Sequence, residues 1–171
     1  MPKLDLSQAP VKTGSVYPEP YAQQMEGRSS LRLGTLAGLT QFGVNIVTLQ
    51  PGAAASLRHW HLKEDEFAMV LTGELILVED EGEIAMHPGD CAAWKAGVAN
   101  GHRFVNRSAA PASFLVVGTK SEDDVASYSD VDMILRTEGG KARFTYRDGS
   151  DWTGPRDLAP PQDLAPQGET E

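Results

Sequence analysis

The sequence has little cysteine and no long apolar run. Its single cysteine, Cys91, excludes a disulfide within the chain and fits a reducing compartment. No stretch of apolar residues approaches the roughly 20 that a membrane-spanning helix requires. The first residues, Met-Pro-Lys-Leu-Asp-Leu, contain an early acid and lack the apolar core of a secretory signal. We therefore expect a cytoplasmic protein that contacts no membrane.

The chain also lacks any concentration of positive charge. Its net charge is −9, and no run of lysine and arginine alternates with aromatic residues, so we expect no nucleic-acid partner. The acids are unevenly spread, because residues 148–171 hold six acidic side chains and one basic side chain, Arg156. This stretch is rich in proline and repeats Asp-Leu-Ala-Pro twice without an apolar core. We predict that it is a disordered acidic tail.

Sustained helical periodicity is missing from residues 30–119. Short apolar runs alternate there with turn residues at intervals of about 8–12 residues, which is typical of an all-β sandwich or barrel. Gly73 interrupts one such run and is predicted to make a tight turn or a bulge. A short helical turn is predicted over residues 121–126, with Ser121 as its cap. The predicted strands cover residues 31–36, 41–49, 54–61, 66–72, 74–79, 83–87, 91–95, 102–106, 112–119, 132–137 and 143–147.

The length of 171 residues, 40% of them hydrophobic, suits a single domain. We predict that this β domain covers residues 30–147. Residues 1–29 are rich in proline, glutamine and serine and are predicted to form an irregular arm. The few apolar residues of the arm indicate packing along the body or along a neighbouring subunit, and free disorder is the alternative.

Two histidines, His59 and His61, alternate along the predicted strand 54–61. Side chains at positions i and i+2 of a strand point to the same face, so the two imidazoles can converge on one point. Trp60 then faces the opposite way. Imidazole is a good ligand for a divalent first-row metal, and a carboxylate commonly completes such a site.

Three carboxylates follow the histidines, and one of them is expected to join the cluster. Glu66 is favoured because it precedes a strand on which it can face inward together with Ala68 and Val70. Glu64 is then expected to be a solvated turn acid. Asp65 is expected to be the same, or a partner that supports a ligand.

A third histidine, His102, opens the predicted strand 102–106, some forty residues further along. It shares a face with Phe104 and Asn106 and is the natural fourth ligand. Three imidazoles and one carboxylate on a six-coordinate ion leave two positions open for a substrate or for dioxygen.

These residues resemble the two conserved motifs of the cupin superfamily. The first motif is matched by Gly52, His59-x-His61, Glu66 and Gly73. The second is matched by Gly89, Gly97, His102 and Asn106. Lys95 departs from the usual proline, and the loop from Gly97 to His102 is two residues longer than the commonest form. Neither departure removes a ligand, although both change the rim. The chain is most similar to small single-domain bacterial cupins of the sugar-phosphate isomerase-like kind.

The resemblance implies a cupin-type double-stranded β-helix, or jelly-roll barrel, that commonly forms a homodimer. It implies one divalent transition metal ion, iron, manganese, zinc or nickel, held inside the barrel by His59, His61, Glu66 and His102. The implied function is to bind or convert a small polar molecule, sugar-like or anionic. An iron-dependent oxygenase and a non-catalytic ligand-binding or sensing module are the alternatives.

Further residues are candidates for the pocket around the metal. Lys95 and Asn100 are expected at the rim, where Lys95 would attract an anionic substrate, although it is equally a candidate for a simple surface lysine. Phe104 is expected to form part of an apolar wall. Gln41 and Asn45 share a face of one strand and are either polar pocket groups or ordinary strand residues. No residue beyond the metal ligands is identified as a catalytic base.

Three remaining side chains receive plainer interpretations. Cys91 is expected to be a small buried hydrophobic residue rather than a reactive thiol. His87, next to a Pro-Gly turn, is expected at the surface. Trp94 could offer a stacking surface to a ring-shaped substrate.

Overall fold

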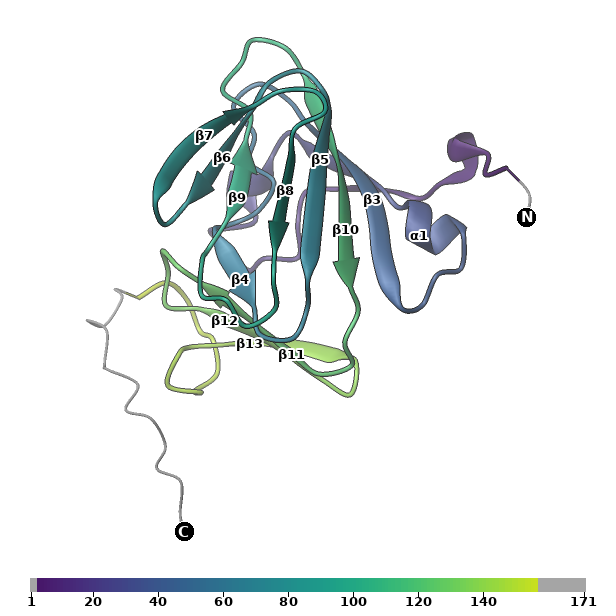
Figure 1. Cartoon of the computed structure of the whole chain (residues 1–171). Helices are drawn as coiled ribbons and strands as arrows, with labels where there is room; N and C mark the ends of the chain where they lie inside the picture. The colour runs from purple at the N-terminus through teal and green to yellow at the C-terminus, as the bar shows by residue number, and fades with distance from the viewer. Residues whose placement is uncertain (1–2, 157–171) are drawn as a thin grey trace.

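The structure is a computed structural model that describes residues 3–156, and its strands form three antiparallel sheets (Figure 1). The largest sheet has six strands in the order β1-β2-β3-β10-β5-β8. These strands are β1 (Val11–Thr13), β2 (Arg28–Leu31), β3 (Phe42–Leu49), β10 (Ala112–Thr119), β5 (Glu66–Thr72) and β8 (Cys91–Trp94). No helix within residues 3–156 has the length and apolar character needed to cross a bilayer.

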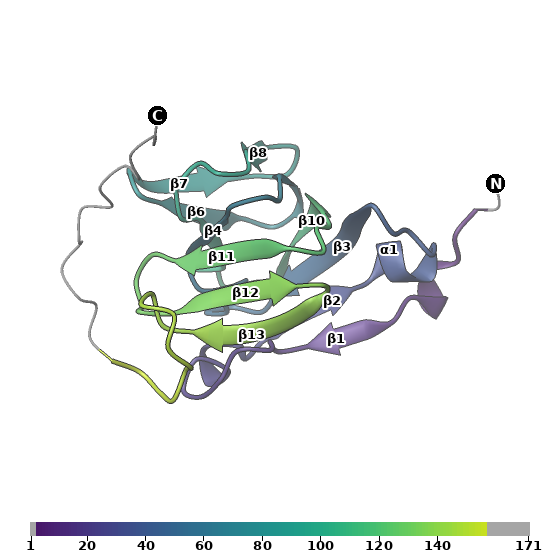
Figure 2. The same cartoon turned by 90° about the horizontal axis from the view of Figure 1, so that it is seen from below.

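Two smaller sheets form the opposite wall. One has the order β13-β12-β11-β4, with β13 (Lys141–Thr145), β12 (Ile134–Glu138), β11 (Asp124–Tyr128) and β4 (His59–His61). The other has the order β7-β6-β9, with β7 (Gly82–Met86), β6 (Leu75–Glu79) and β9 (Arg103–Val105). Figure 2 shows β11, β12 and β13 side by side. His59 and His102 exchange backbone hydrogen bonds of 3.2 and 3.0 Å, so the two sheets meet at this pair.

The all-β fold expected from the sequence is therefore confirmed. The central pair, β3 and β10, is in register over eight residues from Phe42 opposite Thr119 to Leu49 opposite Ala112. Alternate residues of these strands face the interior, as the two-residue period of a strand requires. The buried core between the sheets comprises Val47, Leu49, Ala53, Ala68, Val70, Leu75, Leu77, Met86, Phe104, Ala112 and Phe114.

The N-terminal segment packs along the body and adds a strand to it. Two short 3-10 helices, η1 (Leu6–Gln8) and η2 (Gln23–Met25), flank β1. β1 pairs with β2, which places the segment at the edge of the six-stranded sheet. A second buried cluster joins the N-terminal segment to β11 and comprises Tyr21, Met25, Leu57, Tyr128 and Met133. The segment is thus more regular than its composition indicates.

Three predicted elements differ from the structure. Residues 33–36 form a short helix, α1 (Leu33–Leu36), and the strand before it ends at Leu31. Gly34 allows this helix to approach β3, because a Cβ at this position would lie 2.9 Å from the backbone nitrogen of Val44. The predicted strand 54–61 is reduced to β4. The predicted helical turn over residues 121–126 is wrong, because Asp124 begins strand β11 and pairs with Thr137. The other predicted strands match to within two residues.

The first residues of the predicted C-terminal tail, 148–156, are ordered against the body. Trp152 packs against Tyr21 and Tyr146, with ring centroids 5.8 and 5.1 Å away. Arg156 forms ion pairs with Asp132 and Asp148. Residues 148–156 therefore contact the body, and the remainder of the predicted tail, 157–171, lies outside the described residues.

Candidate metal centre

The short strand β4 presents two imidazoles to the interior of the barrel. The rings of His59 and His61 lie on one face with centroids 5.0 Å apart. The strand is fixed by pairing with β11, where His59 lies opposite Tyr128 and His61 opposite Ala126. Trp60 alternates to the other face, as the period of a strand dictates.

Glu66, the first residue of β5, brings a carboxylate to the same place. Its Oε2 atom lies 3.8 Å from Nε2 of His61. One ligand atom from each of His59, His61 and Glu66 lies within 4.8 Å of the others. The next inward positions of β5, Ala68 and Val70, are buried in the core, so the strand holds Glu66 in place.

His102 reaches this cluster from the loop before β9. Its Nε2 atom lies 2.9 Å from Oε2 of Glu66, and the residue is only 5% exposed. The indole of Trp94 stacks on the imidazole, with centroids 3.8 Å apart and planes 8° from parallel. His102 therefore occupies one face of the Trp94 ring. The backbone bridge between His102 and His59 fixes the position of the loop.

The far nitrogens of two histidines are held by hydrogen bonds. Nδ1 of His59 lies 2.9 Å from the carbonyl oxygen of Leu57, and Nδ1 of His61 lies 2.6 Å from Oδ2 of Asp124. Because a carbonyl oxygen and an ionised carboxylate only accept, Nδ1 is the donor in both cases. This tautomer leaves the Nε2 lone pairs free for a metal, the arrangement that supports most metal-bound histidines.

The protonation states suit a metal. Burial lowers the pKa of His59 to about 4, so its ring is neutral at pH 7. Burial alone would raise the pKa of Glu66, but the hydrogen bond from His102 and the nearby imidazoles lower it to about 2. Burial also disfavours charge on His61, yet the hydrogen bond to Asp124 raises its pKa overall. A cation placed between these groups would meet an ionised carboxylate and uncharged His59.

The spacing of the donor atoms is compatible with one ion. Two ligands about 2.1 Å from an ion lie about 3.0 Å apart when they are neighbours and about 4.2 Å apart when they are opposite. The distances from Oε2 of Glu66 to Nε2 of His102 and of His61 are 2.9 and 3.8 Å, within this range. His102 lies outside the group whose ligand atoms are all within 4.8 Å of one another, and its Nε2 atom donates to Glu66, so His102 would exchange this hydrogen bond for a bond to the ion. Three nitrogen donors and one oxygen donor suit divalent iron, manganese, nickel or zinc.

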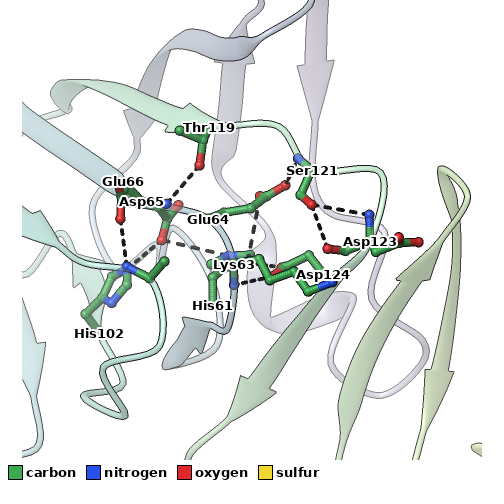
Figure 3. A network of polar contacts seen from close by, with 11 residues as sticks. His61, Lys63, Glu64, Asp65, Glu66, His102, Thr119, Ser121, Asp123 and Asp124 are labelled. Carbon is green, nitrogen blue, oxygen red and sulfur yellow. Dashed lines mark hydrogen bonds and ion pairs between the residues drawn. The ribbon is translucent and has the colours of Figure 1, made fainter.

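A network of acids supports the cluster from outside (Figure 3). Oδ1 of Asp124 accepts a hydrogen bond of 2.8 Å from the backbone nitrogen of Lys63, while Oδ2 contacts His61. Glu64 accepts a hydrogen bond of 2.7 Å from the backbone nitrogen of Ser121 and is half-buried, and burial raises its pKa. Glu64 is thus not the solvated turn acid expected from the sequence. Asp65 is exposed and accepts a hydrogen bond from the backbone nitrogen of Ala96.

Asp124 is a supporting residue that the sequence did not indicate. It is 6% exposed and, with His61 and Glu64, forms a second group of closely spaced ligand atoms. Both of its oxygens accept hydrogen bonds from the chain, which makes it a support for His61 rather than an additional ligand. The signal was the alternation of buried residues along β11, which the predicted helical turn obscured.

Comparison with known proteins places this site in a family. A cupin domain model matches residues 45–118, which include all four candidate ligands. The chain is 56% identical to a protein of Silicibacter pomeroyi that is named as a sugar phosphate isomerase from a cupin superfamily. The match covers 89% of this chain and 97% of that chain, with a TM-score of 0.86. The chain belongs to the cupin superfamily. No curated protein matches this cupin.

Two more distant structures share the cupin fold. One, from Acidithiobacillus ferrooxidans, has a name that proposes a sugar phosphate isomerase. It is 24% identical, with 74% of this chain and 81% of that chain covered and a TM-score of 0.68. The other is a polyketide cyclase from Streptomyces resistomycificus, 24% identical, with 70% and 79% covered and a TM-score of 0.55. At this identity the likeness establishes the fold alone.

A cavity of about 410 Å³ lies inside the cupin barrel, and the four candidate ligands line it. Phe104 and Asn45, both pocket candidates from the sequence, line it as well, as does Trp94. The N-terminal segment contributes Tyr17 to the wall. The ring of Tyr17 packs edge-on against Tyr128, and burial raises the pKa of both phenols.

Three other pocket candidates do not line this cavity. Lys95 follows the inward Trp94 and is therefore turned outward, where it borders a second, more open pocket. Asn100 donates to Oε1 of Glu79 and accepts from the backbone nitrogen of Asp80, so it holds two loops together. Gln41 is exposed, and its carbonyl oxygen accepts from the backbone nitrogen of Lys120. The rim expected from the sequence therefore lies outside the cavity.

Two of the plainer expectations can also be compared with the structure. His87 is exposed at the surface and lies near Glu74 and Asp90. Cys91 is exposed, contrary to the expectation of a buried residue. Since Ala92 and Trp94 face the interior, strand alternation directs Cys91 outward.

Proposed function

We propose that this cupin holds one divalent transition metal ion on His59, His61, Glu66 and His102 and converts a small sugar phosphate inside the barrel. The observation that carries the proposal is the grouping of His59, His61 and the ionised Glu66 on the wall of a cavity large enough for a small molecule, with His102 hydrogen-bonded to Glu66. The name of the 56% identical relative supports the same substrate class.

The metal would polarise a carbonyl or hydroxyl oxygen of the bound molecule and fix its orientation. The chain itself supplies the shape and the electrostatics. Phe104 and Trp94 provide an apolar wall, and Asn45 presents an amide to the same space. The neutral ring of His59 and the ionised Glu66 stay in these states at pH 7, because their pKa values are near 4 and near 2.

Proton transfer has few candidates within the described lining of the cavity. Glu66 is the only carboxylate among those residues. The two phenols of Tyr17 and Tyr128 stay protonated at neutral pH, because burial raises their pKa values, and neither serves as a base. Because Glu66 is assigned to the metal and stays ionised, we assign the transfer of a proton between substrate carbons to water.

Elemental analysis of protein purified without a tag, followed by a turnover assay, tests the proposal. We expect about one metal ion per chain. We also expect deuterium from the solvent to enter carbon-bound positions of a sugar phosphate, which nuclear magnetic resonance detects as aldose and ketose interconvert. Stripping the metal should abolish the exchange. Iron together with oxygen uptake would favour the oxygenase instead, and a stoichiometric metal without turnover would favour a binding module. Sub-stoichiometric metal after reconstitution would contradict the site.

We also propose that two copies pair through the outer face of the six-stranded sheet. The outward positions of β3, β5 and β10 include seven apolar residues that are exposed or only partly buried: Val44, Ile46, Phe67, Met69, Leu71, Leu115 and Val117. A broad apolar face of this kind is typical of a subunit interface. Light scattering should give the mass of a dimer, and Leu115→Glu should give a monomer of unchanged fold. A monomeric wild-type protein would contradict the proposal.

A further inference from the structure

The cavity is lined by far more positive than negative side chains. Within the described residues, Glu66 is its only acid, while Lys12, Arg28, Arg32 and Lys120 line it as well. The whole chain carries a net charge of −9, so this local excess of cations runs against the composition. Arg103 of β9 also lines the wall, and its Nε atom is buried without an acceptor in the described structure.

Three of these cations form one group at the edge of the six-stranded sheet. Arg28 and Ser30 alternate on the cavity side of β2, and Arg32, the exposed residue directly after the strand, also lines the cavity. Lys12 of β1 lies directly opposite Ser30 in the pairing of the two strands. Both arginines and the lysine therefore surround one buried serine.

This group has no acidic counterpart among residues 3–156. None of its three cations forms an ion pair there, whereas Arg58, Arg107, Arg143 and Arg156 all do. Arg28 is half-buried; its Nη1 atom donates to the carbonyl oxygen of Gly14, and its Nε atom is buried without an acceptor in the described structure. Burial, followed by repulsion from Arg32 and Arg28, lowers the pKa of Lys12. Clustered cations that lack a partner are costly unless an anion binds among them.

The group lies at a useful separation from the metal ligands. β2 is three strands away from β5, which carries Glu66, and neighbouring strands are about 4.8 Å apart, so the path along the sheet is roughly 14 Å. Tyr17 lines the same cavity as Arg28 and Glu66. A molecule that contacts both ends must carry its anion at a distance from the atoms near Glu66.

We propose that Lys12, Arg28 and Arg32 bind the phosphoryl group of the substrate, so that the N-terminal segment selects phosphorylated molecules. This inference rests on the function proposed above and adds the residues that recognise the phosphate. Arginine suits the role because its planar group donates two parallel hydrogen bonds to phosphoryl oxygens. The opposite end of the molecule then lies toward Glu66.

Calorimetric titration of the full-length, metal-loaded protein tests the proposal. The probes are inorganic phosphate and a panel of pentose and hexose phosphates, each compared with its unphosphorylated sugar. We expect phosphate and at least one sugar phosphate to bind, and the matching sugar to bind at least about tenfold more weakly. Rising salt should weaken the binding, because the attraction is between charges.

Two variants and a control locate the binding. Arg32→Gln and Lys12→Gln should each weaken phosphate binding about tenfold or more, since each removes a charge-assisted hydrogen bond. Lys141→Gln removes a positive charge on β13 that does not line the cavity, and it should leave binding unchanged. Arg28→Lys, which keeps the charge but loses the planar group, should weaken binding with no change in far-ultraviolet circular dichroism.

Several results would overturn the proposal. They are equal affinity for phosphorylated and plain sugars, no binding of any phosphate, and unchanged affinity in the Lys12→Gln Arg32→Gln double variant. The metal content of each sample, measured in parallel, separates this inference from the proposed function. If the wild-type protein bound phosphate without containing metal, and the variants lost this binding, the result would support the cation group and contradict the metal site.

Discussion

Nδ1 of His61 lies 2.6 Å from Oδ2 of Asp124, a residue 63 positions further along the chain. The second oxygen of Asp124 accepts a hydrogen bond from the backbone nitrogen of Lys63, so the carboxylate is held at both ends. This pair joins β4 to β11 and leaves Nε2 of His61 on the side of Glu66, 3.8 Å from its carboxylate. The orientation of one candidate ligand therefore depends on a residue that does not itself reach the metal position.

Replacing His61 with asparagine should remove the metal and keep the fold. The amide of asparagine can donate to Asp124 in place of Nδ1, but it offers no imidazole Nε2 to a metal. We expect metal content to fall from about one ion per chain to near zero, with little change in the melting temperature of the metal-free protein. His87→Asn, at an exposed histidine, is the matched control and should retain the metal. Full metal content in His61→Asn would remove His61 from the site.

Asp124→Asn should weaken metal binding without abolishing it. Loss of a carboxylate that supports a metal-bound histidine typically costs 10–100-fold in affinity. We expect a change of roughly that size in a competition titration with a chelator, and one ion per chain at saturating metal. Asp123→Asn alters the exposed neighbouring acid, whose side chain accepts a hydrogen bond from the backbone nitrogen of Gly139. If both variants bound metal as the wild type does, Asp124 would have no positioning role.

The same pair should give the metal-free protein a characteristic pH dependence. The pKa of His61 is raised above 6.5 in the folded state. Its contribution to the free energy of unfolding is therefore complete below pH 6.5 and is lost as the pH rises through the pKa of the folded state. The pKa of Asp124 is lowered below 3.8, so its contribution is present above pH 3.8 and is lost as the pH falls through the folded value. The pair therefore stabilises the fold fully between about pH 4 and 6.5.

Urea unfolding of wild type and Asp124→Asn, both treated with a chelator, measures this effect. The difference in free energy of unfolding should be about 2 kcal/mol in that window and should shrink as the pH rises above it. The titrations of His59 and Glu66 occur in both proteins and largely cancel in the difference. A difference that stays flat from pH 4 to pH 9 would show that the two groups are not coupled.

Gly73→Ala should destabilise the barrel strongly. Gly73 has a φ of +73°, and a Cβ there would lie 2.7 Å from the Cβ of Ala112, which is fully buried. Backbone strain and overpacking together should cost about 3 kcal/mol in urea unfolding. Gly52 has a similar φ of +84° but open space around it, so Gly52→Ala should cost only about 1 kcal/mol. Equal losses in the two variants would show that the contact with Ala112 is unimportant.

The sequence predicts the all-β fold because the two-residue period of strands such as β3 and β10 is clear over eight residues. It predicts that histidines and a carboxylate come together, because strand geometry directs alternate side chains to one face. It misses Asp124, because the three adjacent acids after Ser121 look like the start of a helix. It also places Lys95 at the rim by proximity along the chain, although the alternation after Trp94 directs it outward.

The sequence does not predict the ordered structure of the N-terminal segment. Its composition resembles that of an irregular arm, and it gains order from pairing with β3 through β2 and from the burial of Tyr21 and Met25. The grouping of Lys12 with Arg28 and Arg32 depends on this pairing, which joins residues 16 or more positions apart. Long-range strand pairing leaves no local pattern in the sequence, so charges that it brings together stay hidden until the structure is known.

The stretch 148–156 should contribute to stability although its composition is that of a tail. Trp152 packs against Tyr21 and Tyr146, and Arg156 pairs with Asp132, which is only 3% exposed. The guanidinium carbon of Arg156 also lies 3.7 Å from the centre of the Tyr146 ring. Ending the chain at residue 147 should therefore cost roughly 3 kcal/mol, or about 10 °C in melting temperature.

Two shorter changes identify the source of that loss. A chain that ends at residue 156 should melt with the full-length protein, since the residues beyond it offer no apolar core by composition. Trp152→Ala should reproduce most of the loss, because it removes the aromatic contact with both tyrosines. Asp151→Ala, at the exposed neighbour, should have little effect. An unchanged melting temperature in Trp152→Ala and in the chain ending at 147 would show that the stretch covers the body without stabilising it.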